Sequence, residues 1–191
     1  MKPDCKLSDF DEKDVRITTV DGDVFDGVCV WNCAEYGEAE LGRDEESLQI
    51  DHWVFYRSDI RDVRLRTPGE PPLWMGSPLH RMRLQPEPYR QIEAGTKTYE
   101  LRLYDEKRQK VRVGDVIRFE DMTDDYEVLF ARVEELRVFD SFEELYRALP
   151  LRECGYTPET EAAASPKDME RYYPPEEQRR YGVVGIRISL L

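Results

Sequence analysis

The sequence has little histidine and little cysteine, and it contains no long apolar run. Two histidines and four cysteines among 191 residues do not indicate a zinc site, which needs closely spaced Cys or His ligands. No stretch of about 18 apolar residues occurs, which excludes a transmembrane helix. The start of the chain, MKPDCKLSDFDEKD, lacks the apolar segment of a signal peptide. We therefore expect a soluble, cytoplasmic protein with reduced thiols, without a metal or other cofactor and without membrane contact.

Several motifs of catalytic sites are also missing. The sequence contains neither G-x-x-x-x-G-K-[ST] nor G-x-G-x-x-G, the glycine-rich loops that hold phosphate groups. It has no G-x-S-x-G, and two histidines give no signal for a Ser–His–Asp arrangement. Phosphate-loop enzymes and serine hydrolases are therefore not indicated.

The charge of the chain is acidic and unevenly distributed. The net charge of -13 argues against a general nucleic-acid coat, which requires a basic surface. Residues 1–72 hold 9 basic and 18 acidic side chains, a balance of -9. Residues 80–118 hold 10 basic and 6 acidic side chains, a balance of +4. This basic segment within an acidic chain predicts a local anion site.

A proline-rich segment divides the sequence into two parts. Thr67-Pro68-Gly69-Glu70-Pro71-Pro72 cannot continue a helix or a strand ladder, because proline lacks the amide donor and has a fixed φ. We interpret residues 67–78 as a stiff linker between a domain at 1–66 and a domain at 79–191. The fold class that we expect is two small domains.

The first part has the pattern of a small all-β domain. Short runs with alternating hydrophobicity are separated by turn residues, beginning with an Asp21-Gly22 hairpin signal. The predicted strand regions are 15–20, 24–31, 47–56 and 60–65. Because 47–56 reads as two strands, five short strands fall within about 60 residues, which is typical of a strongly bent small barrel.

The same order of strands resembles the Sm-like barrel over residues 7–66. The segment SLQIDHWVFYRSDIRDVRLR carries this resemblance, together with the Asp-Gly hairpin and the long second strand. The RNA pocket of that family uses an Arg/Lys-Gly turn, whereas the corresponding turn here is Arg57-Ser58-Asp59. The resemblance therefore implies protein contact or structural support and does not imply RNA binding by this part.

The second part has a mixed pattern of strands and helices. Pro86 stands where a helix begins, Tyr89 and Ile92 form its apolar stripe, and Gly95 ends it. A capping box opens a helix at Ser141. Further strands are predicted at 80–84, 97–103, 116–119, 127–138 and 183–190, and further helical segments at 141–149 and 165–172.

The segment GTKTYELR at 95–102 is the main candidate for function. On a strand, Thr98, Glu100 and Arg102 point toward solvent or a cleft, while alternate residues face the core. Lys97 lies at the mouth of this strand. The alternative without a binding function is a half-exposed strand with a local Glu100–Arg102 ion pair, which would stabilise the fold by under about 1 kcal/mol. The spacing by itself leaves both interpretations open.

Residues 78–191 resemble the ASCH domain of the PUA-like superfamily. The resemblance is carried by G-x-K-x-x-E-x-R, by the later Val-Gly-Asp turn, and by SFEELYRALPLRECGYTPE and SPKDMERYYPPEEQRRYGVVGIRI. It implies an α+β fold, a β-barrel with helices at its ends, and a cleft beside the Gly-Lys loop that binds RNA or modified nucleosides. By position, Lys97, Glu100 and Arg102 are expected in that cleft.

Tyrosines near the end of the chain are candidates for base stacking. An unpaired base on the ring of Tyr172, Tyr173 or Tyr181 would gain about 1–3 kcal/mol. Core packing is the alternative role for each ring.

These observations support three hypotheses of function. The first is a binding protein for RNA or a modified nucleoside. The second is an amidohydrolase that removes acyl groups from cytidine-type nucleosides, as in a branch of ASCH-like proteins that uses Lys, Thr and Glu. Lys97 matches that lysine, but Glu100 stands at the place of the threonine, so Lys97, Thr98 and Glu100 are the candidates. The third is protein interaction or self-association through edge strands of the acidic barrel.

Overall fold

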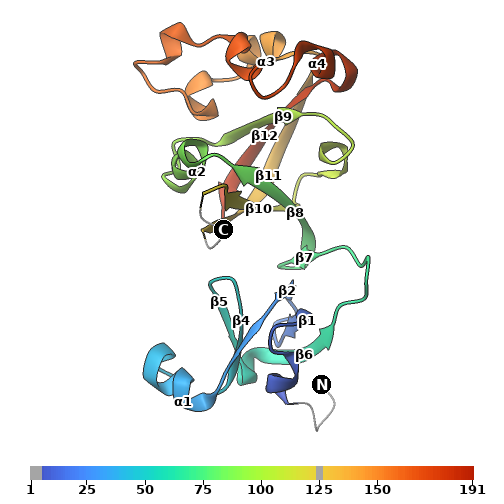
Figure 1. Ribbon diagram of the computed structural model, residues 1–191, viewed down its shortest axis with the longest axis vertical. Coiled ribbons are helices and arrows are strands. Elements are labelled where there is room, and N and C mark those ends of the chain that lie inside the picture. The colour runs from blue at the N-terminus through green and yellow to red at the C-terminus, as the bar shows by residue number, and fades with distance from the viewer. Residues whose placement is uncertain (1–5, 124–126) are drawn as a thin grey trace. The chain divides into compact units, whose positions relative to one another are not determined.

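The computed structural model describes residues 6–123 and 127–191. It divides into two compact units, Met1–Leu79 and His80–Leu191 (Figure 1). Strand β8 (Ser77–Leu84) runs through this division. Each unit is described separately below.

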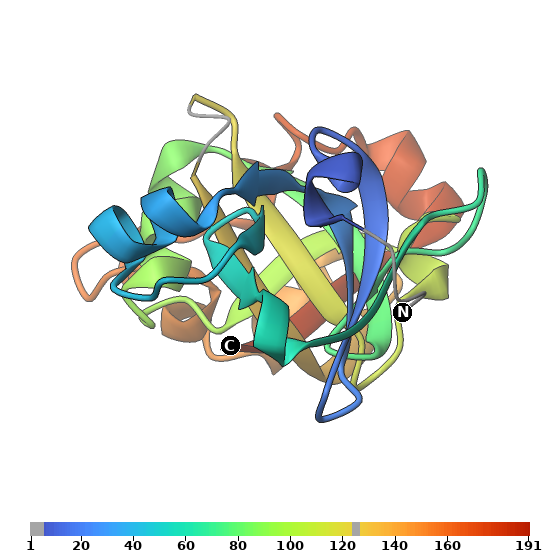
Figure 2. The same ribbon diagram turned by 90° about the horizontal axis from the view of Figure 1, so that it is seen from below.

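The N-terminal unit consists of two small antiparallel sheets. In the first sheet β1 lies between β2 and β6, and in the second β4 lies between β3 and β5. Figures 1 and 2 show the β1–β2 hairpin and the β4–β5 hairpin as separate ribbons. The strands are β1 (Asp14–Thr19), β2 (Val24–Val28), β3 (Val30–Asn32), β4 (Ser47–Ile50), β5 (Trp53–Tyr56) and β6 (Ile60–Leu65). The helical turns are η1 (Leu7–Phe10), α1 (Ala34–Tyr36), η2 (Gly37–Leu41) and η3 (Arg57–Asp59).

The Sm-like barrel predicted for this unit is not confirmed. Among the described residues the strands form two separate sheets and no closed barrel. The predicted second strand is interrupted at Cys29. The amide of Cys29 donates to Lys13 O at 3.0 Å, and its Sγ donates to Phe10 O at 3.0 Å. The backbone of Cys29 thus bonds to the segment leading into β1, and the next residue, Val30, pairs with Gln49 of the other sheet.

The predicted linker at 67–78 is partly folded. Strand β7 (Leu73–Trp74) pairs with the start of β8 through Met75 and Gly76, whose φ angles are 49° and 74°. Two successive positive φ angles are the requirement of a two-residue hairpin loop with a type I′ turn. Trp74 is completely buried, and its ring lies 5.2 Å from that of Phe25 in an edge-to-face contact. The segment therefore ends in a hairpin that contributes to the core.

The C-terminal unit is built on a long antiparallel sheet. Within this unit the strands follow the order β8-β10-β11-β12-β9. It is an open order, so the closed barrel expected for this part is not found among the described residues. The remaining strands are β9 (Tyr99–Leu103), β10 (Val116–Asp121), β11 (Val128–Phe139) and β12 (Val183–Leu190). The helical segments are α2 (Pro86–Glu93), η4 (Arg108–Lys110), α3 (Phe142–Ala148), η5 (Leu151–Cys154), η6 (Glu161–Ala163), η7 (Pro166–Met169) and α4 (Pro175–Tyr181).

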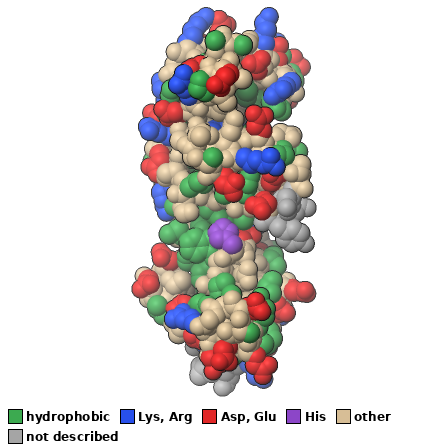
Figure 3. Space-filling model, turned by 90° about the vertical axis from the view of Figure 1, so that its left-hand side faces the viewer, with side chains coloured by type: hydrophobic (Ala, Val, Ile, Leu, Met, Phe, Trp, Pro, Cys, Tyr) green, Lys and Arg blue, Asp and Glu red, His purple; other side chains and the backbone are tan. Residues whose placement is uncertain are grey.

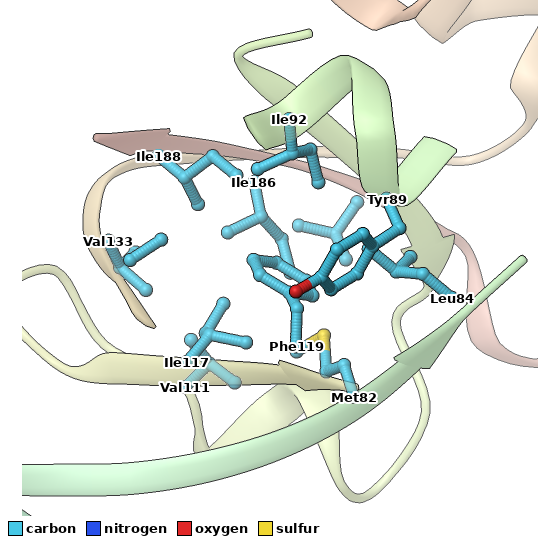
Figure 4. Close-up of a cluster of buried hydrophobic side chains, with 12 residues drawn as sticks. Met82, Leu84, Tyr89, Ile92, Val111, Ile117, Phe119, Val133, Ile186 and Ile188 are labelled. Atoms are coloured by element: carbon cyan, nitrogen blue, oxygen red, sulfur yellow. The ribbon is translucent and has the colours of Figure 1, made fainter. Parts of the chain in front are cut away.

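Two apolar clusters hold this unit together. In the first, Tyr89 and Ile92 of α2 point toward Phe119 and Ile186 of the sheet (Figure 4). In the second, β9 packs against α3 through Leu101 and other buried side chains. Thus α2 packs in the first cluster just before the segment that carries the G-x-K-x-x-E-x-R motif, and α3 packs against the strand of that segment in the second.

The helix predictions have mixed outcomes. Helix α2 begins at Pro86 as predicted, and Ser141 caps α3 by accepting from Glu144 N at 3.3 Å. The helix predicted for 165–172 is wrong, because only the short turn η7 forms there. Helix α4 was missed, although Pro175 at its first position and Gly182 after its end are the usual helix signals.

Gly182 is expected to be intolerant of a side chain. Its φ and ψ are 70° and -172°, and a Cβ there would lie 2.9 Å from Phe139 O. Gly182→Ala should therefore destabilise the C-terminal unit by about 1–3 kcal/mol. Gly114→Ala is the control, since Gly114 also has a positive φ but no atom within 4 Å of its Cβ position. Equal losses for both variants in urea unfolding would show that the contact with Phe139 contributes nothing.

Candidate functional site

The loop that carries the lysine of the motif is fixed by α2 and η5. Gln91 O of α2 accepts hydrogen bonds from Thr96 N and Lys97 N, each at 3.0 Å. The Gln91 side-chain amide donates to Gly155 O at 3.0 Å. One helix residue therefore positions the loop and the turn after η5 together.

Lys97 is buried and its ammonium group is fully used by the protein. The side chain is 6% exposed. Nζ donates to Tyr99 O at 2.7 Å and to Cys154 O at 2.9 Å, and it lies 3.4 Å from Glu100 Oε2. Because an ammonium has three donors, these three acceptors saturate it.

Glu100 and Arg102 extend this buried network. Glu100 is 5% exposed, and its Oε1 lies 2.7 Å from Arg102 Nε. Arg102 also donates to Arg83 O at 2.8 Å and to Tyr173 Oη at 3.5 Å. Burial opposes the charge of Arg102, but the Glu100 carboxylate and the Tyr173 hydroxyl outweigh it and raise its pKa.

The alternation predicted for β9 holds on its apolar side only. Tyr99, Leu101 and Leu103 are buried, as predicted. The expectation that the polar side faces solvent or a cleft is wrong for Glu100, which is buried. The reason is mutual charge compensation, since a carboxylate between an ammonium and a guanidinium can be buried without an unpaired charge.

The candidate tyrosines occupy different environments. The Tyr173 ring stacks on Phe142, with centroids 5.7 Å apart, and burial raises the pKa of Tyr173. Tyr172 is 47% exposed, and Arg171 Cζ lies 4.6 Å from its ring centroid. Arg180 Cζ lies 4.7 Å from the centroid of the Tyr181 ring. The structure thus joins Tyr173 to Arg102, while Tyr172 is part of neither this contact nor the core.

An open hollow of about 790 Å³ lies beside this motif. Thr98 is the sequence-predicted site residue that lines it. The Thr98 hydroxyl donates to Glu153 Oε2 at 2.9 Å, and Thr98 N donates to Glu153 O at 2.8 Å. The full lining is Thr98, Glu134, Glu135, Glu153, Arg187, Ile188 and Ser189.

Hydroxyl groups orient the carboxylates of the hollow. Tyr99 Oη donates to Glu135 Oε2 at 2.6 Å, and Ser189 donates to Glu134. Burial, followed by the hydrogen bond to Glu135, raises the pKa of Tyr99. Arg187 Cζ lies 6.0 Å from the centroid of the Tyr99 ring. The hollow therefore combines carboxylate acceptors with one guanidinium donor.

Sequence reasoning missed most of this lining. The register between β11 and β12 shifts between Val133 and Glu135, so Glu134 is the extra residue of a bulge. A bulge re-aims side chains, and both Glu134 and Glu135 line the hollow. Two adjacent glutamates inside a long strand were the available signal.

Acidic and basic side chains are interspersed over the C-terminal unit on the face shown in Figure 3. Within residues 6–123 and 127–191, no group of three or more His, Cys, Asp or Glu side chains is placed to hold a metal ion. In the same part of the chain, no helix has the length and apolar character needed to cross a membrane.

The thiol of Cys154 is expected to react slowly in the folded protein. Burial raises the pKa of Cys154 to about 11, against a smaller opposite effect of Lys97. Since the thiolate is the reactive form, labelling at pH 8 should be much slower at Cys154 than at the less buried Cys33. Mass mapping after a short iodoacetamide pulse measures both rates. In urea, where the protein is unfolded, the two cysteines should react at similar rates. Equal rates for Cys154 and Cys33 in the native protein as well would contradict this burial.

Comparison with known proteins identifies the family. A family model of the ASCH domain matches residues 82–191. The chain belongs to the ASCH domain family. Hypothetical protein PH0355, known from a crystal structure, shares 34% sequence identity with the matched part of this chain. The TM-score is 0.50, and the match covers 59% of this chain and 99% of that one.

Two other solved structures are similar over a comparable share of the chain. Protein PF0455 from Pyrococcus furiosus is 33% identical, with 59% of this chain and 97% of that chain covered and a TM-score of 0.44. ASCH from Zymomonas mobilis is 16% identical, with 58% and 66% covered and a TM-score of 0.41. No curated protein matches the chain.

Proposed function

We propose that the ASCH unit binds a modified nucleoside, or an unpaired nucleotide of RNA, in the hollow beside Thr98. The observation that carries this proposal is the hollow itself, which adjoins the Gly-Lys loop and is lined by oriented acceptors and one donor. Carboxylates accept hydrogen bonds from exocyclic amines of a base, and a guanidinium donates to its ring carbonyl or nitrogen acceptors. Glu135, Glu153 and Arg187 supply these groups.

The contacts of the motif favour a nucleoside over an RNA strand. Lys97 and Arg102, the residues expected to hold phosphate, already have partners within the protein. An RNA strand also requires several cationic contacts to its backbone. We therefore give Lys97, Glu100 and Arg102 a positioning role, in which Lys97 anchors the carbonyl of Cys154 next to Glu153.

Calorimetric titration with modified nucleosides tests this proposal. A cytidine-type nucleoside should bind the wild-type protein, and Glu153→Gln and Thr98→Val should each weaken binding about tenfold or more, which corresponds to about 1.4 kcal/mol. Glu143→Gln is the control, because Glu143 is an exposed residue of α3 outside the hollow. Unchanged affinity in both hollow variants would overturn the assignment of the site.

Single-stranded RNA provides the second arm of this test. Binding through about three phosphates would give a slope of log K against log salt near -2. Anisotropy of a labelled RNA pool at 50 and 200 mM salt, between which the Debye length falls about twofold, measures that slope. A steep slope together with loss of binding in the hollow variants would assign RNA as the ligand in place of a free nucleoside.

The contact between Thr98 and Glu153 favours a second function, an amidohydrolase for acylated nucleosides. Glu153 would accept the hydroxyl proton as Thr98 Oγ attacks the acyl carbon. The C–N bond then breaks, the amine takes the proton from Glu153, and water hydrolyses the ester to free Thr98. Incubation with N4-acetylcytidine should yield cytidine and acetate, and Thr98→Val should abolish the reaction. Absence of cytidine would exclude this substrate.

Exposed valines support a third function, contact with a protein partner through the N-terminal unit. Val28 is 61% and Val30 52% exposed, on β2 and β3. Self-association is the simplest form of such contact, and light scattering tests it. A clean monomer over a range of concentrations would exclude self-association through these strands.

A further inference from the structure

We infer that the hollow beside Thr98 selects nucleosides whose base carries a positive charge and rejects nucleosides that carry a phosphate. This inference rests on the proposed function, because it names the chemical class of the ligand for the same hollow. It follows from the charge of the lining and from the way in which its carboxylates are held.

The first argument is the charge balance of the lining. Glu134, Glu135 and Glu153 are its acidic residues, and Arg187 is its one basic residue, which gives three negative charges against one positive charge. Many acidic side chains elsewhere in the chain form ion pairs, for example Glu100 with Arg102 at 2.7 Å. Among the described residues, none of the three glutamates of the hollow forms one.

The second argument is that neutral donors hold these carboxylates. Thr98 Oγ1 donates to Glu153 Oε2 and Tyr99 Oη donates to Glu135 Oε2, and Ser189 donates to Glu134. A hydroxyl donor orients a carboxylate but leaves its negative charge in place. Within the described part of the chain, each of these hydroxyl contacts uses one carboxylate oxygen and leaves the other for a ligand.

The third argument is the position of the basic residues. Arg187 lies over the Tyr99 ring, where the ring face attracts its charge, and the Arg137 side chain hydrogen-bonds to the Tyr99 hydroxyl. With both guanidinium groups counted, the three glutamates still leave an excess of one negative charge. The positive charge of Lys97 is compensated by the carboxylate of Glu100, whose Oε2 lies 3.4 Å from Lys97 Nζ. The field in the hollow is therefore negative, and it favours a cation and opposes a phosphate.

Two isomeric nucleosides provide a direct probe. 3-Methylcytidine carries a positive charge at neutral pH, whereas 5-methylcytidine has the same mass and is neutral. In calorimetric titration we expect 3-methylcytidine to bind at least about tenfold more tightly, a difference of about 1.4 kcal/mol, and the difference to shrink as salt screens the charges. Cytidine 5′-monophosphate should bind more weakly than cytidine.

Two substitutions should shift this preference in opposite directions. Glu135→Gln keeps an acceptor for Tyr99 but removes a negative charge, so the preference for 3-methylcytidine should fall severalfold. Arg187→Gln removes the positive charge, so the preference should rise. Glu143→Gln, outside the hollow, should leave it unchanged. General misfolding would weaken both ligands and would not produce shifts of opposite sign.

The outcomes separate this inference from the proposed function. Equal or tighter binding of 5-methylcytidine would overturn the charge selection and leave nucleoside binding intact. A preference that none of the variants shifts would also overturn it, because the selection would then arise outside the hollow. Failure of every nucleoside to bind would overturn both.

Discussion

Replacement of Lys97 by methionine is expected to lower the free energy of unfolding of the ASCH unit by about 3–5 kcal/mol. Methionine fills a similar volume but donates no hydrogen bond, so the carbonyl groups of Tyr99 and Cys154 lose a donor. Glu100 also loses one of its two cationic neighbours while it remains 5% exposed. Loss of one partner of a buried ion pair is among the most costly single changes.

Hydrogen exchange in β9 and β12 measures this effect. Tryptophan fluorescence would not, because all three tryptophans, at 31, 53 and 74, lie outside the ASCH unit. Lys107→Met is the control, since Lys107 is exposed. A loss below about 1 kcal/mol for Lys97→Met, the size found for exposed pairs, would mean that this ammonium is accessible to solvent. In that case Lys97 would be available to bind phosphate, as the motif led us to expect.

Replacement of Asp26 by alanine is expected to destabilise the N-terminal unit by about 3–5 kcal/mol. Asp26 is 3% exposed and accepts hydrogen bonds from Arg16 Nε and from Leu73 N, each at 2.8 Å. Arg66 Nε lies 3.4 Å from the same carboxylate. The alanine variant leaves two guanidinium groups together without this counter-charge and releases the start of β7.

Tryptophan fluorescence during urea unfolding reports on this unit, because it contains all three tryptophans. Asp44→Ala, at an exposed position, is the matched control and should change the midpoint little. The same midpoint for Asp26→Ala and Asp44→Ala would contradict a structural role for the Asp26 network.

The sequence predicted local features well where a short pattern determines the structure. Pro86 and the apolar pair Tyr89 and Ile92 were sufficient to place α2, since one helical turn sets both its start and its buried face. Ser141 placed the start of α3 for the same reason. The buried side of β9 followed from simple alternation.

Features that depend on distant residues were not predictable in this way. Burial of Glu100 requires Lys97, Arg102 and the turn near Cys154, which alternation along β9 does not include. The hollow depends on a bulge in β11 that is visible only when β12 is paired with it. Closure of a barrel likewise depends on pairing between strands far apart in the chain, and the interruption at Cys29 shows how one residue redirects a strand.

On the proposed function, the motif acts by positioning. Lys97 ties the Gly-Lys loop to the carbonyl of Cys154, and this places Glu153 against Thr98 at one wall of the hollow. We propose that this charge pattern is internal scaffolding and that Thr98 and side chains of β11, β12 and η5 meet the ligand.

Nuclear magnetic resonance of the amide groups during titration with a modified nucleoside tests the central claim most directly. The account predicts shift changes at the residues that line the hollow, with the largest at Thr98, Glu135 and Arg187, and small changes around the exposed ring of Tyr172. Shift changes centred on Tyr172, or spread along residues 104–112 without change at Thr98, would contradict the hollow as the binding site.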